Sequence, residues 1–323
     1  MGGPVELALR PDEETQKRFA AELDELVDPG ERLGVAVSGG PDSVALLLLA
    51  AATRPGSVEA ATVDHRLRRE SAGEARFVAS LCNQLGVPHA TLAVDVSPGA
   101  SLQARARHAR YRALADWATE QSLDAVATAH HADDQAETLL MRLARGAGLS
   151  GLAATRRVRQ LDRDVMLVRP LLSWRRSELA EIVAGADIQP IDDPTNRDPR
   201  HDRSRFRGLV ERSDWAEADR LASSALWLAE AEEAIEWTVE RLVSERLSVF
   251  GDEIAIDPGG LPRELQRRLL LIAFDRFEAQ RPRGPQLDRA MRSLTAGRTA
   301  SLSGLKLAGG ATWKVTLAPA RRG

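Results

Sequence analysis

Between residues 33 and 145 the sequence alternates short apolar runs with longer helical patterns, and this alternation limits the possible fold more than any other feature. A short apolar run after a turn predicts a buried strand, and a longer amphipathic segment predicts a helix. Strands joined by helices form βαβ units, so we predict an α/β fold with a doubly wound, mostly parallel sheet covered on both faces. The predicted strands are residues 33–37, 58–63, 88–94 and 125–129, and the helices after them begin at residues 43, 71, 102 and 133.

The rest of the sequence predicts one helix before this region and a smaller, mainly helical part after it. Residues 15–26 form the first predicted helix, which a Pro-Gly turn ends. The later elements are a strand at 166–171, a helix at 175–184, a polar loop at 190–202, helices at 214–247 and 261–279, and a small β element at 300–318. We therefore predict a first domain at 1–210, a smaller helical domain at 211–299 and a short β-rich tail at 300–323.

The single cysteine, Cys82, excludes a disulfide framework and a cysteine-rich metal site. It ends the helical pattern 75–82, so we predict a small buried residue, with a reactive thiol as the alternative. No apolar run approaches the length of a membrane span, and no signal peptide is visible at the start of the sequence. We expect a cytoplasmic protein that does not associate with a membrane.

Charge is distributed unevenly along the chain, although the formal net charge is only −3. Residues 141–176 hold nine Arg against two acids, and residues 279–323 hold nine basic residues against one acid. Between them, residues 214–260 hold twelve acids against three Arg. Such runs can be solvated surface, but clustered positive charge also suits contacts with the phosphates of a nucleic acid. Charge alone leaves both interpretations open.

A glycine-rich segment lies between the first predicted strand and the helix after it, with the sequence Ser38-Gly39-Gly40-Pro41-Asp42-Ser43. Glycines let the backbone approach an anion closely, and the N–H groups at a helix N-terminus present positive potential to phosphate. The hydroxyls of Ser38 and Ser43 can donate hydrogen bonds. Asp42 tolerates a phosphate only if a cation lies between them, which implies Mg²⁺. The segment is neither G-x-x-x-x-G-K-[ST] nor G-x-G-x-x-G, which argues against P-loop NTPase and dinucleotide sites.

This segment resembles the SGGxDS signature of the N-type ATP pyrophosphatases, which have an adenine nucleotide alpha hydrolase-like fold. Members of that group split ATP between the α and β phosphates and leave an adenylated intermediate. The resemblance implies ATP as cofactor and release of AMP and pyrophosphate. It also implies these nucleotide-binding residues: Ser38, Gly39, Gly40, Pro41, Asp42, Ser43, Asp64 and His65.

Further motifs narrow the resemblance. They are Asp64-His65-Arg66-Leu67-Arg68, Ala129-His130-His131-Ala132-Asp133-Asp134-Gln135-Ala136-Glu137-Thr138, Arg169-Pro170-Leu171-Leu172 and Asp192-Asp193-Pro194-Thr195-Asn196-Arg197-Asp198. Together they are similar to motifs of the tRNA(Ile)-lysidine synthetase family. This resemblance implies a ligase that adenylates the wobble cytidine in the CAU anticodon of an isoleucine tRNA and joins that base to free L-lysine. The C-terminal part matches only loosely, as a helical domain that would help to grip tRNA.

Asp134 and Glu137 are three residues apart at the start of a predicted helix, so their carboxylates share one face. They follow the carboxyl end of a strand, where open α/β sheets bind ligands. The pair can orient an ammonium group, hold Mg²⁺ or accept a proton from an attacking amine, whereas helix capping is the structural alternative. We predict that Asp42, Asp134 and Glu137 are catalytic and that Asp42 and Asp134 bind magnesium. For His130 and His131, hydrogen bonding is a better interpretation than a metal site.

Three further catalytic positions follow from the resemblance: Arg110, Asn196 and Arg203. Arg110 lies in a predicted helix beside a tyrosine and is expected to hold phosphate or base. The family usually continues with Asn after the last of these positions, whereas this chain has Ser204, so the detailed geometry of that loop can differ. Other arginines of the same helix are either functional or part of a solvated face: Arg105, Arg107 and Arg112.

Three other kinds of protein are alternatives to this prediction. A tRNA thiolase of the same superfamily needs cysteines, and Cys82 alone does not supply them. A small-molecule amidating synthetase has no obvious need for the arginine-rich segments, and it stays the alternative. A non-catalytic RNA-binding protein does not need Asp42, Asp134 and Glu137. The sequence leaves the oligomeric state open, including a homodimer.

Overall fold

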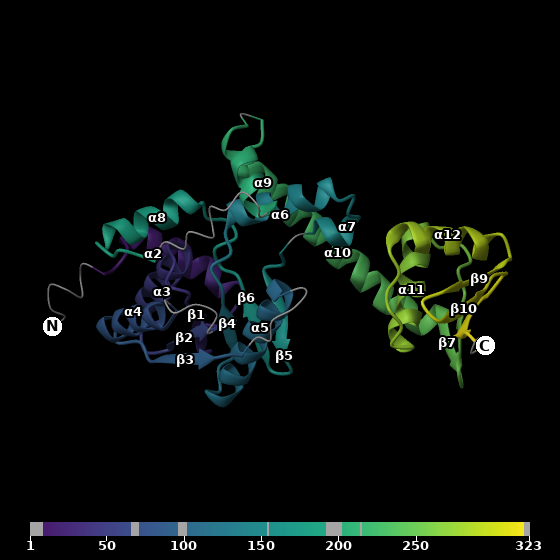
Figure 1. The fold of residues 1–323 in the computed structure, drawn as a ribbon, viewed down its shortest axis with the longest axis horizontal. Helices are drawn as coiled ribbons and strands as arrows, with labels where there is room; N and C mark the ends of the chain where they lie inside the picture. Colours follow the sequence, from purple (N-terminus) through teal and green to yellow (C-terminus); the bar gives the residue numbers. More distant parts are fainter. Residues whose placement is uncertain are drawn as a thin grey trace. The chain divides into compact units, whose positions relative to one another are not determined.

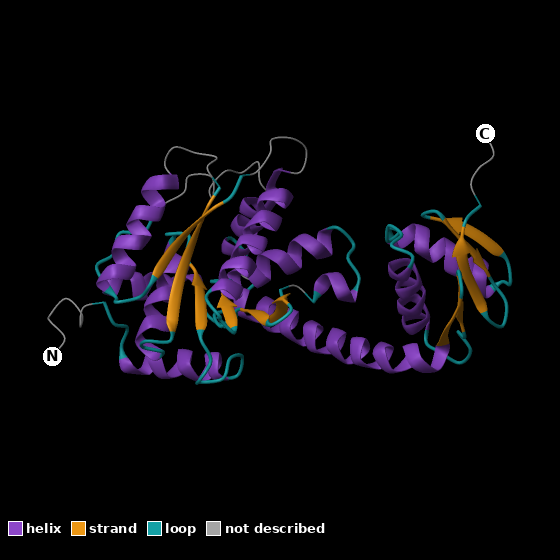
Figure 2. Ribbon diagram, turned by 90° about the horizontal axis from the view of Figure 1, so that it is seen from below, coloured by secondary structure: helices purple, strands orange, loops and turns teal. Residues whose placement is uncertain are grey.

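The computed structural model describes residues 9–65, 71–95, 102–153, 155–191, 202–213 and 215–319. The chain divides into two compact units, Met1–Ala229 and Glu230–Gly323, and each unit has its own sheet (Figure 2). None of the described helices combines the length and the apolar character needed to span a bilayer.

The first unit is built on a six-stranded sheet with the order β3-β2-β1-β4-β6-β5. Its strands are β1 (Leu33–Ala36), β2 (Val58–Asp64), β3 (His89–Ala93), β4 (Ala125–Ala127), β5 (Val158–Asp162) and β6 (Val165–Val168). All pairs are parallel except β5 with β6. The chain runs from β1 outward to β3 and returns to the other side of β1 with β4. Open α/β sheets bind ligands at such a reversal, outside the carboxyl ends of the strands.

Helices cover both faces of this sheet (Figure 1). One hydrophobic core packs α2, α3, α4 and α8 against the sheet, and a separate core packs α5 against the opposite face. The predicted doubly wound sheet is therefore confirmed. The helices of this unit are α2 (Glu13–Asp24), α3 (Pro41–Thr53), α4 (Ser71–Gln84), α5 (Leu102–Glu120), α6 (Ala132–Ala144), α7 (Leu149–Leu152), α8 (Arg176–Gly185) and α9 (Asp202–Glu211).

The two cores follow from the side chains that the sequence supplies. α3 is apolar on every side, and all its residues from Ser43 to Ala50 are buried. Cys82 of α4 is completely buried in the same core, as predicted. On the other face, Trp117 of α5 packs on Gly34 of β1, where a Cβ atom would lie 2.8 Å from the indole ring. That strand position therefore requires glycine.

The second unit combines helices with an antiparallel sheet of the order β7-β8-β11-β10-β9. Helix α10 (Ala218–Arg246) leads into it. The buried carboxylate of Glu232 accepts two hydrogen bonds from Arg268, of 2.6 and 2.8 Å, which fasten α10 to α11. The other elements are β7 (Leu247–Phe250), β8 (Glu253–Ile256), α11 (Arg263–Arg276), α12 (Gly284–Thr295), β9 (Thr299–Leu302), β10 (Leu305–Ala308) and β11 (Trp313–Leu317).

The structure adds short elements that the sequence pattern does not predict, namely α7, α9, α12, β5, β7 and β8. β5 is a polar edge strand that contains Arg159, Gln160 and Asp162, so its alternation gives no clear apolar signal. β7 begins at Leu247, directly after α10 and at the last residue of the predicted helix 214–247. β8 pairs with β11, so the strands of the predicted tail share a sheet with β7 and β8. The domain limits at residues 210 and 299 stay predictions.

Candidate active site

The glycine-rich segment connects β1 to α3 at the point where the strand order reverses. The Ser43 hydroxyl accepts a hydrogen bond from the Ser38 N–H (3.1 Å) and donates one to the Gly40 carbonyl (2.9 Å). Gly40 is the N-cap of α3, and no side chain of the described residues caps this helix. The N–H groups of the first turn therefore present their positive potential to a ligand, which suits an anion such as phosphate.

Gly39 meets two requirements that other residues cannot. Its φ of +86° lies in the left-handed region that favours glycine. A Cβ atom here would also lie 2.4 Å from Cδ1 of Ile191, whose N–H donates a hydrogen bond to the Gly39 carbonyl (2.9 Å). The start of the predicted polar loop therefore packs directly on the glycine-rich segment.

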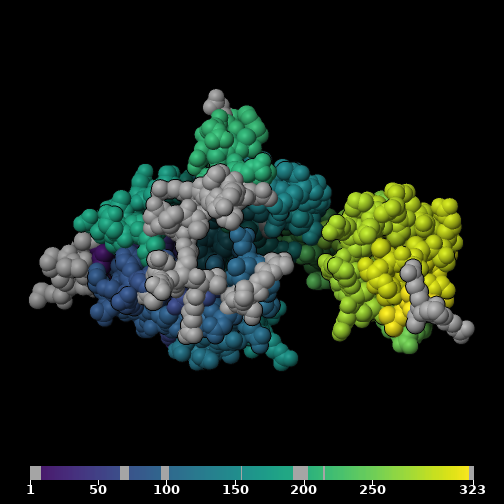
Figure 3. Space-filling model, in the orientation of Figure 1, coloured from purple at the N-terminus to yellow at the C-terminus, as the bar shows by residue number. Residues whose placement is uncertain are grey.

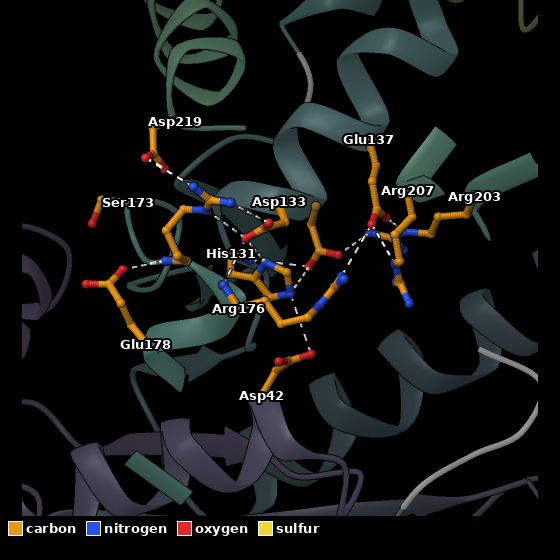
Figure 4. Close-up of polar contacts among 12 residues, drawn as sticks. Asp42, His131, Asp133, Glu137, Ser173, Arg176, Glu178, Arg203, Arg207 and Asp219 are labelled. Atoms are coloured by element: carbon orange, nitrogen blue, oxygen red, sulfur yellow. Dashed lines mark hydrogen bonds and ion pairs between the residues drawn. The ribbon is translucent and has the colours of Figure 1, made fainter. Parts of the chain in front are cut away.

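His131 joins the N-terminal turns of α3 and α6 (Figure 4). It is fully buried among the carboxylates of Asp42, Asp133 and Asp134. Its Nε2 atom lies 3.5 Å from Asp42 Oδ2 and 3.6 Å from Asp134 Oδ2, and its Nδ1 atom lies 3.6 Å from Asp133 Oδ2. Two catalytic predictions from distant parts of the sequence, Asp42 and Asp134, are thus brought to one imidazole.

Each charged side chain in this group favours the ionised form of its neighbours. Burial disfavours the imidazolium, but the carboxylates of Asp134, Asp133 and Asp42 outweigh it and raise the pKa of His131 to about 9. The three carboxylates therefore favour the imidazolium form of His131. Burial likewise opposes ionisation of Asp134, yet the charges of His131 and Arg203 hold its pKa below the usual range.

Glu137 is almost completely buried on α6 and is surrounded by arginines. It accepts hydrogen bonds from Arg203 (2.9 Å), Arg207 (2.9 Å) and Arg176 (3.3 Å), as Figure 4 shows. Arg203 also donates to Asp134 at 2.6 Å. Asp134 and Glu137 therefore share one face of α6, and their ion pairs hold α8 and α9 against it.

Asp133 connects α6 to the start of α8. It accepts hydrogen bonds from the Arg175 guanidinium (3.2 and 3.3 Å) and from the Arg176 N–H (2.8 Å). Burial opposes its ionisation, but His131 and Arg175 outweigh burial and hold the pKa of Asp133 far below the usual range. Arg175 also binds Asp219 at the start of α10 (3.2 Å). Asp133 therefore stays ionised beside Nδ1 of His131, where its role is structural.

Two other residues of the same motif support the backbone. Asp134 accepts a hydrogen bond from the His131 N–H (3.3 Å), so the helix-capping alternative describes part of its role. Gln135 is buried and binds both backbone groups of Thr155, donating to the carbonyl (2.8 Å) and accepting from the N–H (3.0 Å). These bonds fix the start of α6 and the turn that precedes β5.

The remaining predicted site residues lie at the same edge of the sheet where the structure describes them. Asp64 is the last residue of β2, and His65 follows it. Burial and the neighbouring charge of Arg110 lower the pKa of His65, which places Arg110 of α5 close to this strand end. Arg203 lies on α9. Asn196, and most of the two motifs at 64–68 and 192–198, lie outside the described residues.

The oxygen atoms of the site suit a magnesium ion held partly by a ligand. Asp42 Oδ1 is buried and has no hydrogen-bond partner among the described residues. Within those residues, no group of three or more His, Cys, Asp and Glu side chains is arranged to hold a metal by itself. Mg²⁺ commonly binds through one or two carboxylates together with phosphate oxygens and waters. Asp42 and Asp134, which face the same imidazole, fit that requirement.

No role for Gln135, Arg176 and Arg207 is predicted from the sequence, and His131 is not predicted as the centre of the site. The spacing of Arg203 and Arg207 is a usable signal, because residues four apart share one face of a helix. Their partner Glu137 is 66 and 70 residues away, so the pairing itself follows only from the fold.

Residues 146–151 have the spacing G-x-G-x-x-G, but they are not a dinucleotide site. This segment follows α6 and leads into the four-residue helix α7. A dinucleotide motif follows a strand and opens a long helix, so the spacing here is coincidental.

Comparison with known proteins decides the family. A family model described as the PP-loop domain matches residues 11–213. The chain is 45% identical to a tRNA(Ile)-lysidine synthase of Zymomonas mobilis over 90% of each chain, and 47% identical to one of Novosphingobium aromaticivorans over 94% of each. The chain belongs to the tRNA(Ile)-lysidine synthase family. This membership confirms the predicted resemblance and the use of ATP, and it does not favour an amidating synthetase.

The fold of the first unit extends beyond this family. A solved U34-tRNA thiolase of Methanococcus maripaludis, with a [4Fe-4S] cluster, matches with a TM-score of 0.56 and 16% identity. The match covers 68% of this chain and 77% of the thiolase. It shows a shared fold alone, because the iron–sulfur chemistry requires cysteines and this chain has one, buried in α4.

Proposed function

We propose that this protein is a tRNA-modifying ligase that forms lysidine. It adenylates the wobble cytidine in the CAU anticodon of an isoleucine tRNA with ATP, joins that base to free L-lysine, and releases AMP and pyrophosphate. The observation that supports this most directly is the uncapped start of α3 beside Asp42, in a chain whose relatives are named tRNA(Ile)-lysidine synthase. We expect the reaction to take place in the cytoplasm.

The proposed reaction has two displacements. First, the carbonyl oxygen of the cytosine attacks the α phosphorus of ATP, and the bond to the β phosphate breaks so that pyrophosphate leaves. Second, the side-chain amine of lysine attacks the ring carbon that carries the adenylated oxygen. The bond between that carbon and the oxygen breaks, and AMP leaves with the oxygen. The amine must lose a proton, which a neighbouring carboxylate or phosphate oxygen can accept.

In this proposal the glycine-rich segment holds the phosphates of ATP. The backbone N–H groups at the start of α3 and the hydroxyls of Ser38 and Ser43 donate to the phosphate oxygens. Asp42 and Asp134 would hold Mg²⁺, which neutralises charge on those oxygens and polarises the phosphorus that is attacked. The unpaired Asp42 Oδ1 is the atom best placed for this role.

Lysine does not meet a free acidic surface, because each carboxylate on this face of α6 is paired with a cation. We therefore propose an exchange at Arg203, whose side chain is 44% exposed. An ammonium group of lysine would replace Arg203 at Asp134, and the released guanidinium would bind the lysine carboxylate. After the exchange Asp134 and Arg203 would each still face an opposite charge, so neither is left as a buried charge without a partner.

We further propose that the arginine-rich segments 141–176 and 279–323 contact tRNA phosphates. Phosphate contacts supply most of the sequence-independent affinity for a nucleic acid and position it for contacts with the base.

The proposal can be tested with purified protein, ATP and radiolabelled amino acids. Label should enter isoleucine tRNA with a CAU anticodon only from lysine, with one AMP formed for each lysine bound. The same tRNA with a wobble uridine is the control and should accept no label. Incorporation of another amino acid, or AMP formation that needs a small acid and no tRNA, would instead indicate another PP-loop ligase.

A further inference from the structure

A second charged group lies at the same edge of the sheet and has no role in the reaction described above. Tyr111 on α5 contacts two guanidinium groups, because Cζ of Arg107 is 5.0 Å and Cζ of Arg159 is 4.5 Å from the centre of its ring. Arg169, the first residue after β6, interacts with the Tyr111 side chain. We call Arg107, Tyr111, Arg159 and Arg169 the arginine–tyrosine cluster.

Arg169 is the buried member of this cluster, with a relative exposure of only 2%. One of its guanidinium nitrogens donates to the Arg156 carbonyl at 2.6 Å. Its Nε atom is buried and has no hydrogen-bond partner among the described residues. A buried donor without an acceptor is costly, so its presence indicates that a ligand can supply the missing oxygen.

The cluster contains several cations and no anion. Among the residues that the structure describes, no carboxylate is paired with Arg107, Arg159 or Arg169. Burial and then the charges of Arg159 and Arg107 lower the pKa of Arg169, while Tyr111 opposes the change. Arg110 of α5 is exposed to solvent. Arg107 is exposed as well, so a ligand can reach the group from outside.

The arginine–tyrosine cluster lies at the same edge of the sheet as the carboxylate site around His131, on the face that α5 covers. β6 runs parallel to β4, so Arg169 lies at the carboxyl edge of the sheet, as the glycine-rich segment does. α5 covers one face of the sheet, whereas α3 covers the opposite face. The charges of Asp134, Arg169 and Arg107 all act on His130, which therefore lies near both groups. The visible face of this unit is hollowed, with residues of the teal part of the chain at the floor (Figure 3).

The geometry of phosphoryl transfer bears on the side of the sheet from which the RNA approaches. The attacking oxygen and the leaving group lie on opposite sides of the phosphorus in an in-line displacement. If pyrophosphate leaves towards the start of α3, approach of the base from the side that α5 covers satisfies this geometry. The backbone of the RNA strand would then pass that side as well, close to the arginines.

We infer that the arginine–tyrosine cluster binds a backbone phosphate of the RNA strand next to the target nucleotide. The guanidinium groups match the oxygens of a phosphodiester, and the buried Arg169 donor makes the site directional. This inference rests on the proposed function, because it assumes an RNA substrate. A phosphate of ATP is the other source of the same chemistry, and the test separates the two.

The first test measures binding without catalysis. Arg107→Ala and Arg159→Ala are compared with Arg112→Ala, an exposed arginine of α5 outside the cluster. Each cluster variant should weaken the affinity for unmodified isoleucine tRNA about tenfold and make the log–log salt dependence shallower by roughly 0.7. The control variant should change neither quantity. Thermal melting of each variant checks that the fold is intact.

ATP binding to the same variants, measured by calorimetry without tRNA, identifies the source of the phosphate. We expect unchanged ATP affinity. Loss of ATP affinity with normal tRNA binding would assign the cluster to the nucleotide, and unchanged binding of both ligands would remove it from phosphate recognition. Both outcomes overturn the inference.

The second test locates the phosphate on the RNA. A series of tRNAs, each with one neutral methylphosphonate within two nucleotides of the wobble position, is bound to the natural protein and to Arg159→Ala. At one position the neutral linkage should weaken binding to the natural protein but not to the variant. Equal losses for both proteins at every position would contradict the assignment. If the natural protein binds tRNA in this pattern but never incorporates lysine, the proposed function fails while the phosphate site stands.

Discussion

The carboxylate site around His131 and the arginine–tyrosine cluster lie at one edge of the same sheet, yet they handle charge in opposite ways. Around His131, Asp133, Asp134 and Glu137 are each paired with a cation, and these pairs hold α6, α8 and α9 together. In the arginine–tyrosine cluster the cations lie beside one another, and within the described ranges no carboxylate neutralises them.

This difference indicates how each region contributes to the protein. Paired buried charges lose stability when one partner is removed, so the carboxylate site is part of the framework as well as the reaction. Like charges held together lower the stability of the folded protein, and binding of an anion restores that stability. Asp42 is the exception within the carboxylate site, because one of its oxygens is buried and has no described partner.

The largest effect is expected from removing Mg²⁺. If the free oxygen of Asp42 is a cation ligand, a chelator should abolish the formation of AMP and pyrophosphate, because the phosphates cannot bind beside an unshielded carboxylate. Added Mg²⁺ should restore the full rate. A strict requirement for zinc or iron would contradict this assignment.

Replacing the same carboxylate should have the next largest effect. Asp42→Ala should lower pyrophosphate release by about 10³-fold, the scale of losing one electrostatic contact to a transition state. The side chain of Asp42 is 32% exposed and opens its helix, so the fold should remain intact. Asp116→Ala, an exposed acid on α5, is the matched control. Near-normal pyrophosphate release by Asp42→Ala would remove the glycine-rich segment from the mechanism.

The variant Glu137→Gln tests the carboxylate site, where charges are paired, against the arginine–tyrosine cluster, where they are not. The variant should bind ATP and tRNA but lose lysine incorporation, because the carboxylate that organises Arg203 no longer carries a charge. It should also lower the free energy of unfolding by roughly 1–3 kcal/mol, since three arginines lose a buried partner. Arg159→Ala should change that free energy by less than about 0.5 kcal/mol.

Single-turnover assays with labelled ATP and labelled lysine, combined with urea unfolding, measure both effects. Normal lysine incorporation by Glu137→Gln would show that this face of α6 does not serve the second step. Equal destabilisation by the glutamate and arginine variants would remove the contrast between the two regions.

In both regions the sequence predicts the helices and strands better than the contacts between them. The alternation of apolar runs predicts the parallel strands and α3, because buried strands and helices depend on local patterns. The position of Ser38–Ser43 between strand and helix follows from the same pattern. The pairing of Glu137 with Arg203 and Arg207 could not be predicted, because it depends on how distant helices dock.

The arginine–tyrosine cluster shows the same limit. Arg107 and Tyr111 are four apart on one helix, so their contact is predictable from spacing. Arg159 and Arg169 reach them through the edge pairing of β5 with β6, and β5 is a strand that the polar sequence conceals. Prediction from sequence therefore gives the elements, while the assembled charges require the fold.

A smaller effect is expected in the salt dependence of tRNA binding by the natural protein. Affinity should fall steeply as salt rises, because phosphate contacts release counterions. A cluster variant should make the slope shallower by less than one unit, whereas Glu137→Gln should leave the slope unchanged. Titration of fluorescent tRNA at several salt concentrations measures this. A slope near zero for the natural protein would mean that neither the cluster nor the arginine-rich segments contact phosphate.

The smallest effect concerns Cys82, which should not influence either region. It is completely buried in the core beneath α3, and burial raises the pKa of its thiol to about 12. At pH 8 roughly one molecule in 10⁴ then carries the thiolate, which is the form that alkylating reagents attack. Iodoacetamide should therefore label the folded protein very slowly and leave lysine incorporation unchanged, while urea-unfolded protein should label quickly. Cys82→Ala should keep full activity with modest loss of stability. Rapid labelling of the folded protein, together with inactivation, would reopen the alternative of a reactive thiol.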